Sequence, residues 1–401
     1  MNDKATTGPL AGITVLDLTR VLSGPYCTMM LADMGARVIK IEQPGKGDDT
    51  RAWGPPFQNG ESTYFLSINR NKESVTINLK HEEGKKVIKE LLESTDVLVE
   101  NFRPGTLDRI GFGYKELSNK YPRLVYCSVS GFGHSGPRHL QPGYDAIMQA
   151  EGGLMSITGP SDGPGYKLGV SITDITSGMF AAFGVAMALL SRHHTGRGQF
   201  VDIGMFDSAA ALLSFQASIY FATGQAPGRI GNCHPTIMPY ETLETLDDDL
   251  VVAVGNDHLW KTFCSVINLQ HLAEDDRFAS NKDRVKSRKL LKPMIEKQLQ
   301  MHPAHEWIIK LREHGVPCGS VRDLSQVLTD EQLIERAMVV ALEHPIVGAM
   351  QTLGIPIKLA GTPGSIRTPP PTLGQHTNEV LQKDLYFDAK KIESLRKSGA
   401  I

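Results

Sequence analysis

The chain has 401 residues, enough for two or three domains and at least one large buried core. Lysine and arginine (42) nearly balance aspartate and glutamate (44), which excludes a general basic surface for nucleic acid or an anionic membrane. A hydrophobic content of 41% with 21% charged residues excludes a disordered, collagen-like or coiled-coil chain.

Strands and helices alternate through the first third of the chain. Residues 12–18 and 37–42 read as buried strands on either side of a helix that ends near Gly35, which predicts a β-α-β unit. Continued alternation predicts an α/β fold with an open, parallel, Rossmann-like sheet. Further strands are expected at 74–79, 96–101 and 123–129, with helices near 82–93 and 114–120.

The second half of the chain changes character twice. Two apolar helices, expected at 172–193 and 206–222 and joined by a short strand, are predicted to pack on the sheet. Short strands and lysine-rich helices follow, and the last 60 residues return to strands, turns and a charged helix over 376–398. We predict a large domain formed by residues 1–224 and 326–401 and a smaller α+β domain formed by residues 225–325.

Two features bear on the compartment. Five cysteines are spread along the chain without a CxxC pair, which disfavours disulfides and structural zinc and favours a reducing compartment. The N-terminal segment MNDKATTGPLAG lacks the profile of a secretory signal, so we expect a cytoplasmic protein.

The longest apolar stretch, 178–190, is shorter than the about 20 residues of a bilayer span, which predicts a buried core helix.

Two motifs that suggest bound cofactors are weak. Residues 131–136 match GxGxxG after a strand, but Pro137 follows where a helix N-terminus should receive the phosphates. The assignment as a nucleotide oxidoreductase therefore has little support, although this loop can still contact a ligand. The histidine pairs His193–His194 and His302/His305 lack carboxylates or cysteines at ligand spacing, so no metal site is expected.

Asp174 is the most informative carboxylate. It lies just inside the start of the most apolar helix, where Ser171 or Thr173 could cap. The positive end of the helix dipole is expected to lower the pKa of this carboxylate and keep it ionised. Acidic residues in a first turn are commonly only stabilising. Beside the small Ser177 and Gly178, however, the carboxylate would meet a ligand while poorly hydrated, and such a group can act as a nucleophile.

A second cluster of polar residues, 101–109, begins where a predicted strand ends. Ligands of open α/β sheets bind beyond the carboxyl ends of the strands, so Asn101, Arg103 and Arg109 are placed to meet an anion. Pairing of Arg109 with a surface carboxylate explains the spacing equally well. Arg51, in a polar turn, is likewise either solvated or directed at a ligand.

Together these segments resemble the class III CoA-transferases (CaiB/BaiF type), the family of formyl-CoA:oxalate and carnitine CoA-transferases. Within the family they are most similar to the succinate–hydroxymethylglutarate type. The matches run in order from end to end: LxGxxVLDLTRVLSGP at 10–25, GARVIKIEQPGxGDDTR at 35–51, NRNKxS at 69–74, VENFRPGTLDRIG at 99–111, SVSGFG at 128–133, GYDAIMQAEGG at 143–153, TDITSG at 173–178, TGRGQ at 195–199, GVPCG at 315–319 and PPPTLGQHTNEVL at 369–381.

The resemblance implies a large domain built from both chain ends and a homodimer whose chains interlock. It also implies that Asp174 attacks an acyl-CoA thioester and carries first an acyl anhydride and then a CoA thioester. Coenzyme A would be a cosubstrate, with no tightly bound cofactor, the donor would be similar to succinyl-CoA and the acceptor a dicarboxylic acid. The CoA-contacting positions that the resemblance carries over are Val21, Ser23, Ile77, Lys80, Asn101, Phe102, Arg109, Ser130, Gly131, Phe132 and Gly133.

Three positions depart from the formyl-CoA transferase pattern. Leu22 stands in place of a glutamine, Gln43 in place of a basic residue and Ser130 in place of a lysine. Phosphate binding is therefore expected to depend on Arg109, Lys80 or other cations. The long polyglycine loop of that enzyme is also missing, which argues against specialisation for oxalate.

The second carboxylate of an acceptor would need a cation, and Arg51, Arg20 and His234 are the candidates. The main alternative is an α-methylacyl-CoA racemase, since racemases share the fold. They use the histidine of a GHD motif as a base, whereas this chain has Tyr144 there, and a tyrosine of ordinary pKa is a poor base at neutral pH. A non-catalytic CoA-binding protein would leave Asp174 without a role.

Overall fold

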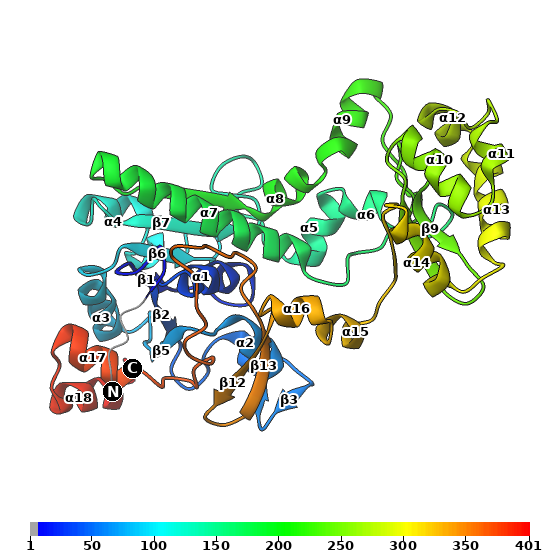
Figure 1. The fold of residues 1–401 in the computed structure, drawn as a ribbon. Helices are drawn as coiled ribbons and strands as arrows, with labels where there is room; N and C mark the ends of the chain where they lie inside the picture. The colour runs from blue at the N-terminus through cyan, green and yellow to red at the C-terminus, as the bar shows by residue number, and fades with distance from the viewer. Residues whose placement is uncertain (1–6) are drawn as a thin grey trace. The chain divides into compact units, whose positions relative to one another are not determined.

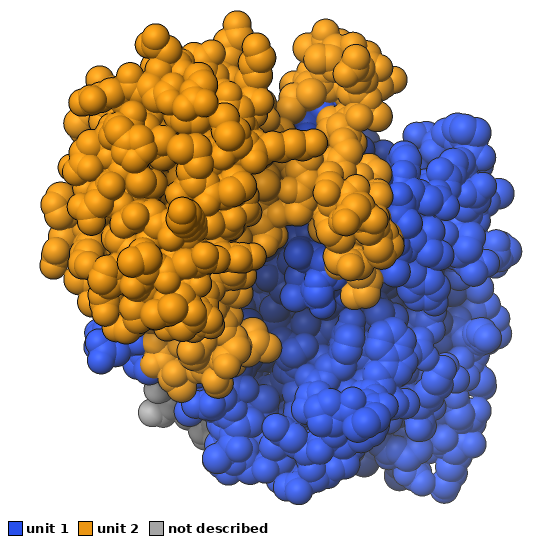
Figure 2. Space-filling view, turned by 90° about the vertical axis from the view of Figure 1, so that its right-hand side faces the viewer, with its two compact units in different colours: residues 1–154, 168–217, 331–401 blue, residues 155–167, 218–330 orange. Residues whose placement is uncertain are grey.

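The protein is described here by a computed structural model that covers residues 7–401. The chain forms two compact units, coloured separately in Figure 2. The first contains residues up to 154 with 168–217 and 331–401, and the second contains 155–167 and 218–330. Residues 155–167, 218–224 and 326–330, which the sequence-based division placed in the large domain, cluster with the second unit. Residues 1–6 of the N-terminal segment behind the cytoplasmic expectation lie outside the described part.

The first unit is built on a six-stranded sheet in which every neighbouring pair is parallel, in the order β5-β2-β1-β6-β7-β8 (Figure 1). The prediction of an open, parallel α/β sheet is therefore confirmed. The strands are β1 (Thr14–Asp17), β2 (Arg37–Glu42), β5 (Lys72–Thr76), β6 (Val97–Glu100), β7 (Val125–Ser130) and β8 (Phe200–Gly204).

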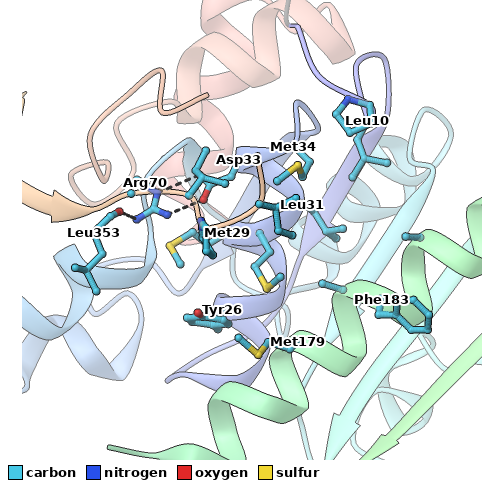
Figure 3. A pocket seen from close by; sticks show the side chains of 18 of the residues that line it. Leu10, Tyr26, Met29, Leu31, Asp33, Met34, Arg70, Met179, Phe183 and Leu353 are labelled. Atoms are coloured by element: carbon cyan, nitrogen blue, oxygen red, sulfur yellow. Dashed lines mark hydrogen bonds and ion pairs between the residues drawn. The ribbon is translucent and has the colours of Figure 1, made fainter. Parts of the chain in front are cut away.

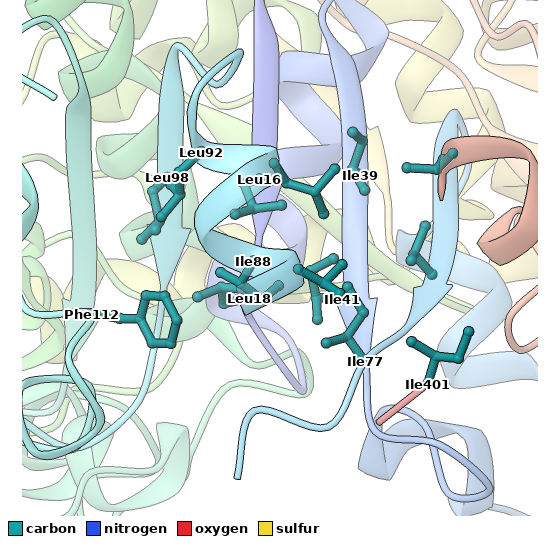
Figure 4. Packing of buried hydrophobic residues seen from close by; sticks show 14 of the residues in the cluster. Leu16, Leu18, Ile39, Ile41, Ile77, Ile88, Leu92, Leu98, Phe112 and Ile401 are labelled. Atoms are coloured by element: carbon teal, nitrogen blue, oxygen red, sulfur yellow. The ribbon is translucent and has the colours of Figure 1, made fainter. Parts of the chain in front are cut away.

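Successive strand residues point to opposite faces of the sheet, so each strand contributes to two cores. Val15 packs in the core that α1 and α7 cover, whereas Leu16 packs in the core that α3, α4, α17 and α18 cover. Figure 4 shows the second core, in which Ile88 of α3 lies beside Leu18. The covering helices are α1 (Ser23–Asp33), α3 (Glu82–Leu92), α4 (Tyr114–Lys120), α7 (Ile172–Thr195), α17 (Thr377–Leu385) and α18 (Ala389–Lys397).

The strand order reverses between β1 and β6. The chain leaves β1 through α1 to β2 on one side of β1, and it returns later to β6 on the other side. Such a reversal opens a crevice outside the carboxyl ends of the two strands, where ligands of open α/β sheets bind. Residues 18–22 after β1 and residues 101–107 after β6 flank this crevice.

Two helices that the sequence predicted as continuous are broken. Ser214 (φ +43°) separates α8 from α9, and Tyr386 (φ +56°) separates α17 from α18. A left-handed residue ends one helical hydrogen-bond ladder, so the chain must start another. The remaining elements of the first unit and the α8–α9 pair are η1 (Asp49–Ala52), β3 (Phe57–Gln58), β4 (Glu61–Ser62), α2 (Thr63–Ile68), η2 (Asp108–Ile110), α5 (Asp145–Glu151), α8 (Met205–Leu212), α9 (Ser214–Thr223), α16 (Glu331–Glu335), β12 (Val339–His344) and β13 (Gly348–Leu353).

Helix α7 differs from its prediction. Within residues 7–401 it is the helix that is long and apolar enough, by length and composition, to cross a membrane. Ala181, Val185 and Ala188 are buried against α1 and the sheet, whereas Phe183 and Leu190 are exposed. The prediction of a buried core helix is therefore correct for one side of α7 and wrong for the other.

The second unit has a three-stranded antiparallel sheet in the order β11-β10-β9. Helices pack on it around the fully buried Trp260 and Trp307. Its buried Arg284 donates to the carbonyls of Met238 and Phe278, so this charge is hydrogen-bonded in the core. The elements are α6 (Leu154–Ile157) at the junction, β9 (Tyr240–Glu244), β10 (Asp249–Ala253), α10 (Asp257–Val266), α11 (Gln270–Ala273), α12 (Asn281–Lys286), α13 (Arg288–Leu299), α14 (Ala304–Glu313), β11 (Cys318–Ser320) and α15 (Leu324–Leu328).

Candidate active site

A cavity of about 320 Å³ lies in the first unit at the crevice between β1 and β6. Its walls come from the segments after β1, β6 and β7, from the loop before α5 and from the first turn of α7. The structure therefore joins segments far apart in sequence, such as those that contain Arg20 and Asp174. Nine of the predicted site residues line it: Arg20, Val21, Ser23, Asn101, Phe102, Arg103, Ser130, Gly131 and Asp174.

The Asp174 carboxyl is half-buried in this cavity. Burial, and next the negative charge of Asp145, raise its pKa to about 7, against a hydrogen bond from the Ser23 hydroxyl that lowers it. The sequence-based expectation of a lowered pKa is therefore wrong. Helix dipoles act weakly over one turn, whereas removal of water penalises the charged form directly.

Asp145, at the start of α5, is a site residue that sequence reasoning missed. Its Oδ1 accepts hydrogen bonds from the Thr173 backbone N–H (2.9 Å) and hydroxyl (2.7 Å), and its Oδ2 accepts one from Gln149 (2.7 Å). The expected cap is wrong, because Ser171 makes no side-chain cap bond and Asp145 satisfies the α7 N–H instead. No local signal links residues 28 positions apart, although both lie in segments of the family resemblance.

A second cavity, of about 340 Å³, continues along the same edge of the sheet. Ile77 and Lys80 line it, so two of the expected CoA-contacting positions lie together. Arg20, Phe102 and Thr106 line both cavities, which makes the two cavities neighbours along one wall. The combined site has room for a long ligand with one end at Asp174.

Three predicted residues lie outside the walls of both cavities. Arg109 is exposed in η2 and donates to the Thr106 hydroxyl at 3.3 Å. Phe132 packs against Phe206, with Arg138 over its ring, and Gly133 takes a left-handed turn (φ +74°). Their roles as CoA contacts stay predictions.

Ser130, at the end of β7, carries an unsatisfied polar atom. Its side chain is 5% exposed, and its Oγ has no hydrogen-bond partner among the described residues. Buried hydroxyls are nearly always paired, so an orphan on a cavity wall is suited to a ligand. At the other two positions of departure, Leu22 is buried with Met29 and Ile68, and Gln43 is exposed on the wall of the second cavity.

The three candidate cations for a second carboxylate lie in different surroundings. Arg20 lies on the cavity wall, where its guanidinium pairs with Asp49 at 3.2 Å. Arg51 binds Glu42 through two contacts of 2.7 Å and lines neither cavity, so its assignment as a carboxylate reader is wrong. His234 belongs to the second unit. Within residues 7–401 no group of three or more histidines, cysteines or carboxylates is placed to hold a metal ion.

Comparison with known proteins identifies the family of this chain. The profile of CoA-transferase family III matches residues 10–377. The chain is 41% identical over 393 residues to a mouse succinyl-CoA:glutarate CoA-transferase (98% of this chain, 90% of the relative) and 43% identical over 355 residues to an Acetobacter aceti acetyl-CoA:oxalate CoA-transferase (88% and 90%). A crystal structure of a CaiB/BaiF family protein from Brucella suis superimposes with a TM-score of 0.84 at 36% identity, covering 94% of this chain and all of that one. The chain therefore belongs to CoA-transferase family III and is a class III CoA-transferase that uses CoA thioesters.

Proposed function

We propose that this enzyme transfers CoA from succinyl-CoA, or a similar acyl-CoA, to a free dicarboxylic acid, with Asp174 as the nucleophile. The observation that carries the proposal is the position of Asp174, a poorly hydrated carboxylate in the cavity at the sheet crevice. Aspartate carboxylates form covalent intermediates of this kind in other enzymes. A site that excludes water also protects such intermediates from hydrolysis.

The reaction proceeds in four balanced displacements. The ionised Asp174 oxygen attacks the acyl carbonyl of the donor, the C–S bond breaks, and CoA leaves as a thiolate from a mixed anhydride. The thiolate then attacks the aspartyl carbonyl and releases the donor acid as a free carboxylate, leaving a CoA thioester on Asp174. The acceptor carboxylate displaces CoA thiolate to form a second anhydride. Attack of the thiolate on the acceptor's carbonyl gives the new acyl-CoA and regenerates Asp174, with no net proton change.

Each displacement places negative charge on a carbonyl oxygen, which needs hydrogen-bond donors. Helix α1 begins at Ser23, on the cavity wall, without a side-chain cap. The backbone N–H groups of a first helical turn have no partner within the helix. In α1 these are the N–H groups of Ser23 and Gly24, because Pro25 has none and Tyr26 donates to the Leu22 carbonyl. We assign the stabilisation of the developing oxyanion to these two groups, because preorganised N–H donors strengthen in a water-poor cavity.

The two cavities suit a CoA thioester. The second cavity, with Ile77 and Lys80, is assigned to the nucleotide end of CoA, and the wall that includes Phe102 to the pantetheine arm. The orphan hydroxyl of Ser130 is assigned to a polar group of that arm. Lys80 is exposed and therefore free to meet phosphate oxygens.

A dicarboxylic acceptor fits the charges of the site. Glutarate and oxalate, named for the two relatives, both carry a second carboxylate. Of Arg51, Arg20 and His234, Arg20 is the one on the cavity wall, which also includes Arg103, and the ion pair of Arg20 with Asp49 is partly exposed. Such pairs are weak in water, so an acceptor's distal carboxylate can displace Asp49 at low cost.

The proposal is tested with succinyl-CoA and a panel of free acids, followed by mass spectrometry of the acyl-CoA products. We expect glutaryl-CoA from glutarate, with succinate released in equal amount, and little product from pentanoate, which has the same length but one carboxylate. Equal transfer to both acids would contradict the dicarboxylate assignment. Intact succinyl-CoA with every acid, together with deuterium exchange at Cα of a 2-methylacyl-CoA, would favour the racemase alternative.

We also propose that the enzyme is a homodimer, and the exposed side of α7 supports this. We call Met179, Phe180, Phe183, Met187 and Leu190 the α7 apolar face; all five side chains are exposed. Monomeric proteins rarely expose contiguous apolar surface of this kind. A cavity of about 450 Å³ lies beside it, between α1 and α7, lined by flexible methionines (Figure 3). Methionines adapt readily to an inserted apolar side chain, here that of a second copy.

Replacing Phe183 by aspartate is expected to convert the dimer to a monomer, because the new charge would be buried without a partner in the interface. Light scattering after size-exclusion chromatography measures the change as a halved mass. The control is Tyr386→Asp, an exposed aromatic side chain away from α7 at a left-handed position that aspartate tolerates. A dimer that persists in the Phe183 variant would contradict the assignment.

A further inference from the structure

An ion pair is buried beneath the candidate active site. The Lys40 and Asp48 side chains are each 0% exposed, with Nζ and Oδ2 2.9 Å apart. Lys40 Nζ also donates to the Thr19 carbonyl at 2.8 Å. Burial of two charges is costly, and apolar residues commonly stabilise a core as well or better. Stability alone therefore does not account for this pair.

Beside the pair, the backbone of Val21 is strained. Its φ is +68°, in the left-handed region that a β-branched residue rarely adopts. A conformation of this kind persists only where the surrounding structure imposes it, and it occurs mainly at functional sites. Val21 lies between β1 and α1 and lines the cavity that contains Asp174.

The surroundings of Val21 do impose its conformation. Four consecutive backbone N–H groups, of residues 18–21, each donate to a different acceptor. Asp48 Oδ1 receives the last of them, from Val21, at 3.2 Å. The other three acceptors are the Val99 carbonyl for Leu18 (2.9 Å), Asp17 Oδ1 for Thr19 (2.8 Å) and Asn101 Oδ1 for Arg20 (2.8 Å).

The conformation of Val21 determines where α1 begins relative to Asp174. Ser23, two residues later, lines the same cavity as Asp174, and its hydroxyl acts to lower the pKa of that carboxyl. A Cβ added at Gly178 would lie 2.6 Å from the Ser23 carbonyl oxygen, so the first turn of α1 touches α7 one turn beyond the nucleophile. A shift of residues 20–22 would therefore displace Ser23 and the N–H donors of α1 from the reacting centre.

We propose that Lys40 and Asp48 are positioning residues. Lys40 orients the Asp48 carboxylate, whose oxygen holds Val21 in its left-handed conformation. This conformation in turn aligns the first turn of α1 with Asp174. The pair itself touches no reacting atom. Its effect on rate rests on the proposed function, whereas its effect on the backbone does not. The structural part is therefore measurable without turnover.

Two double variants test the acceptor, Asp48 Oδ1, which also accepts hydrogen bonds from the Thr50 backbone N–H (2.9 Å) and hydroxyl (2.8 Å). The glycine substitution at Val21 separates the bond to Val21 from these two. Lys40→Met/Asp48→Asn removes both charges but keeps a side-chain oxygen for the Val21 N–H, whereas Lys40→Met/Asp48→Leu removes both charges and the oxygen. We expect the asparagine variant to retain at least about a third of the wild-type kcat and the leucine variant to lose about 100-fold, the scale of a 1 Å misplacement. Lys40 and Asp48 also border the second cavity, but Ile77, Lys80 and Phe102 are unchanged, so the KM for acyl-CoA is expected to change less than kcat.

A rescue separates positioning from general damage to the fold. Val21→Gly, added to the leucine variant, is expected to restore kcat at least about tenfold, because glycine adopts positive φ without steric cost. Hydrogen exchange of the peptide covering residues 18–23, read by mass spectrometry, is expected to be slow in the wild type and the asparagine variant and fast in the leucine variant. If the leucine variant fails to fold, Lys40→Met/Asp48→Ala replaces it in every arm.

Failure of this inference and failure of the proposed function are distinguishable. Equal kcat and equal exchange in the two double variants of an active enzyme would overturn the positioning role, and so would absence of rescue by glycine. A wild type that transfers no CoA would instead overturn the proposed function, while the exchange difference would still support the structural role of the pair.

Discussion

Replacing Asp174 by asparagine is expected to abolish CoA transfer and at the same time to stabilise the fold. Asparagine has the shape of aspartate but no ionised oxygen, so no anhydride forms and kcat is expected to fall by at least about 10³-fold. Binding of CoA is expected to persist, since the cavity walls at Ser23, Asn101 and Ile77 are unchanged. Mass spectrometry of the protein should also show no covalent CoA adduct.

The stabilisation follows from the raised pKa of Asp174. The carboxyl has a pKa of about 7 in the folded state and 3.8 as its ordinary value, so folding disfavours its charge. The cost is absent below pH 3.8, grows between pH 3.8 and about 7, and is constant above, where it amounts to up to about 4 kcal/mol. The asparagine variant avoids this cost, so its advantage in free energy of unfolding is larger at pH 8 than at pH 5.

The same ionisation governs the rate. Because the nucleophile must be charged, kcat/KM for acyl-CoA is expected to rise with pH through about 7 and then to level off. A matched control is Asp207→Asn, which changes the exposed first-turn aspartate of α8 outside both cavity walls. Loss of its interaction with the helix dipole is expected to destabilise slightly, by about 0.5 kcal/mol. A stabilised Asp207 variant, or a destabilised Asp174 variant, would contradict the electrostatic assignment.

Replacing Arg51 by methionine is expected to destabilise the first unit by about 3 to 5 kcal/mol, because it leaves the buried Glu42 carboxylate without its partner. Although burial opposes ionisation, the contacts from Arg51 lower the pKa of Glu42, so the charge is present at neutral pH. Arg51 also lies over the Phe65 ring at 3.6 Å, a contact that methionine cannot reproduce electrostatically. Chemical denaturation monitored by circular dichroism measures the loss.

The neighbouring ion pair supplies the control for Arg51. Arg20→Met breaks the partly exposed pair with Asp49, and exposed pairs contribute at most about 1 kcal/mol. The effects on the KM for glutarate are expected to be the opposite of those on stability. Arg20→Met raises this KM, whereas Arg51→Met in the folded protein does not. An Arg51 variant with unchanged stability and a raised acceptor KM would restore Arg51 as the carboxylate reader.

The fold was predictable because its signals are local. Buried parallel strands such as 37–42 are short apolar runs, and helix α4 begins and ends where its pattern does. The helix interruptions were missed because a single residue causes each of them. Ser214 and Tyr386 take left-handed conformations that their residue types do not predict, so the two predicted helices are four in the structure.

The site was predictable only in part. Asp174 stood out from its place at a helix start, and the family resemblance added Val21, Ser23 and Asn101, which the structure brings to one cavity. Arg51 was misjudged because an exposed cation and a buried one look alike in sequence. Its pairing depends on how the 43–51 turn folds back over Glu42.

By itself, the sequence determined the strand and helix alternation and, through its ordered motifs, the family. Both depend on residue types at fixed positions along the chain. The tertiary structure alone decided the charge state of Asp174, since burial in the cavity and the approach of Asp145 from α5 outweigh the helix dipole. It also decided the conformation of Val21, because Asp48 and Asn101, which follow other strands, accept from the N–H groups of Val21 and Arg20. Electrostatics and backbone strain depend on distance in space, which sequence order does not contain.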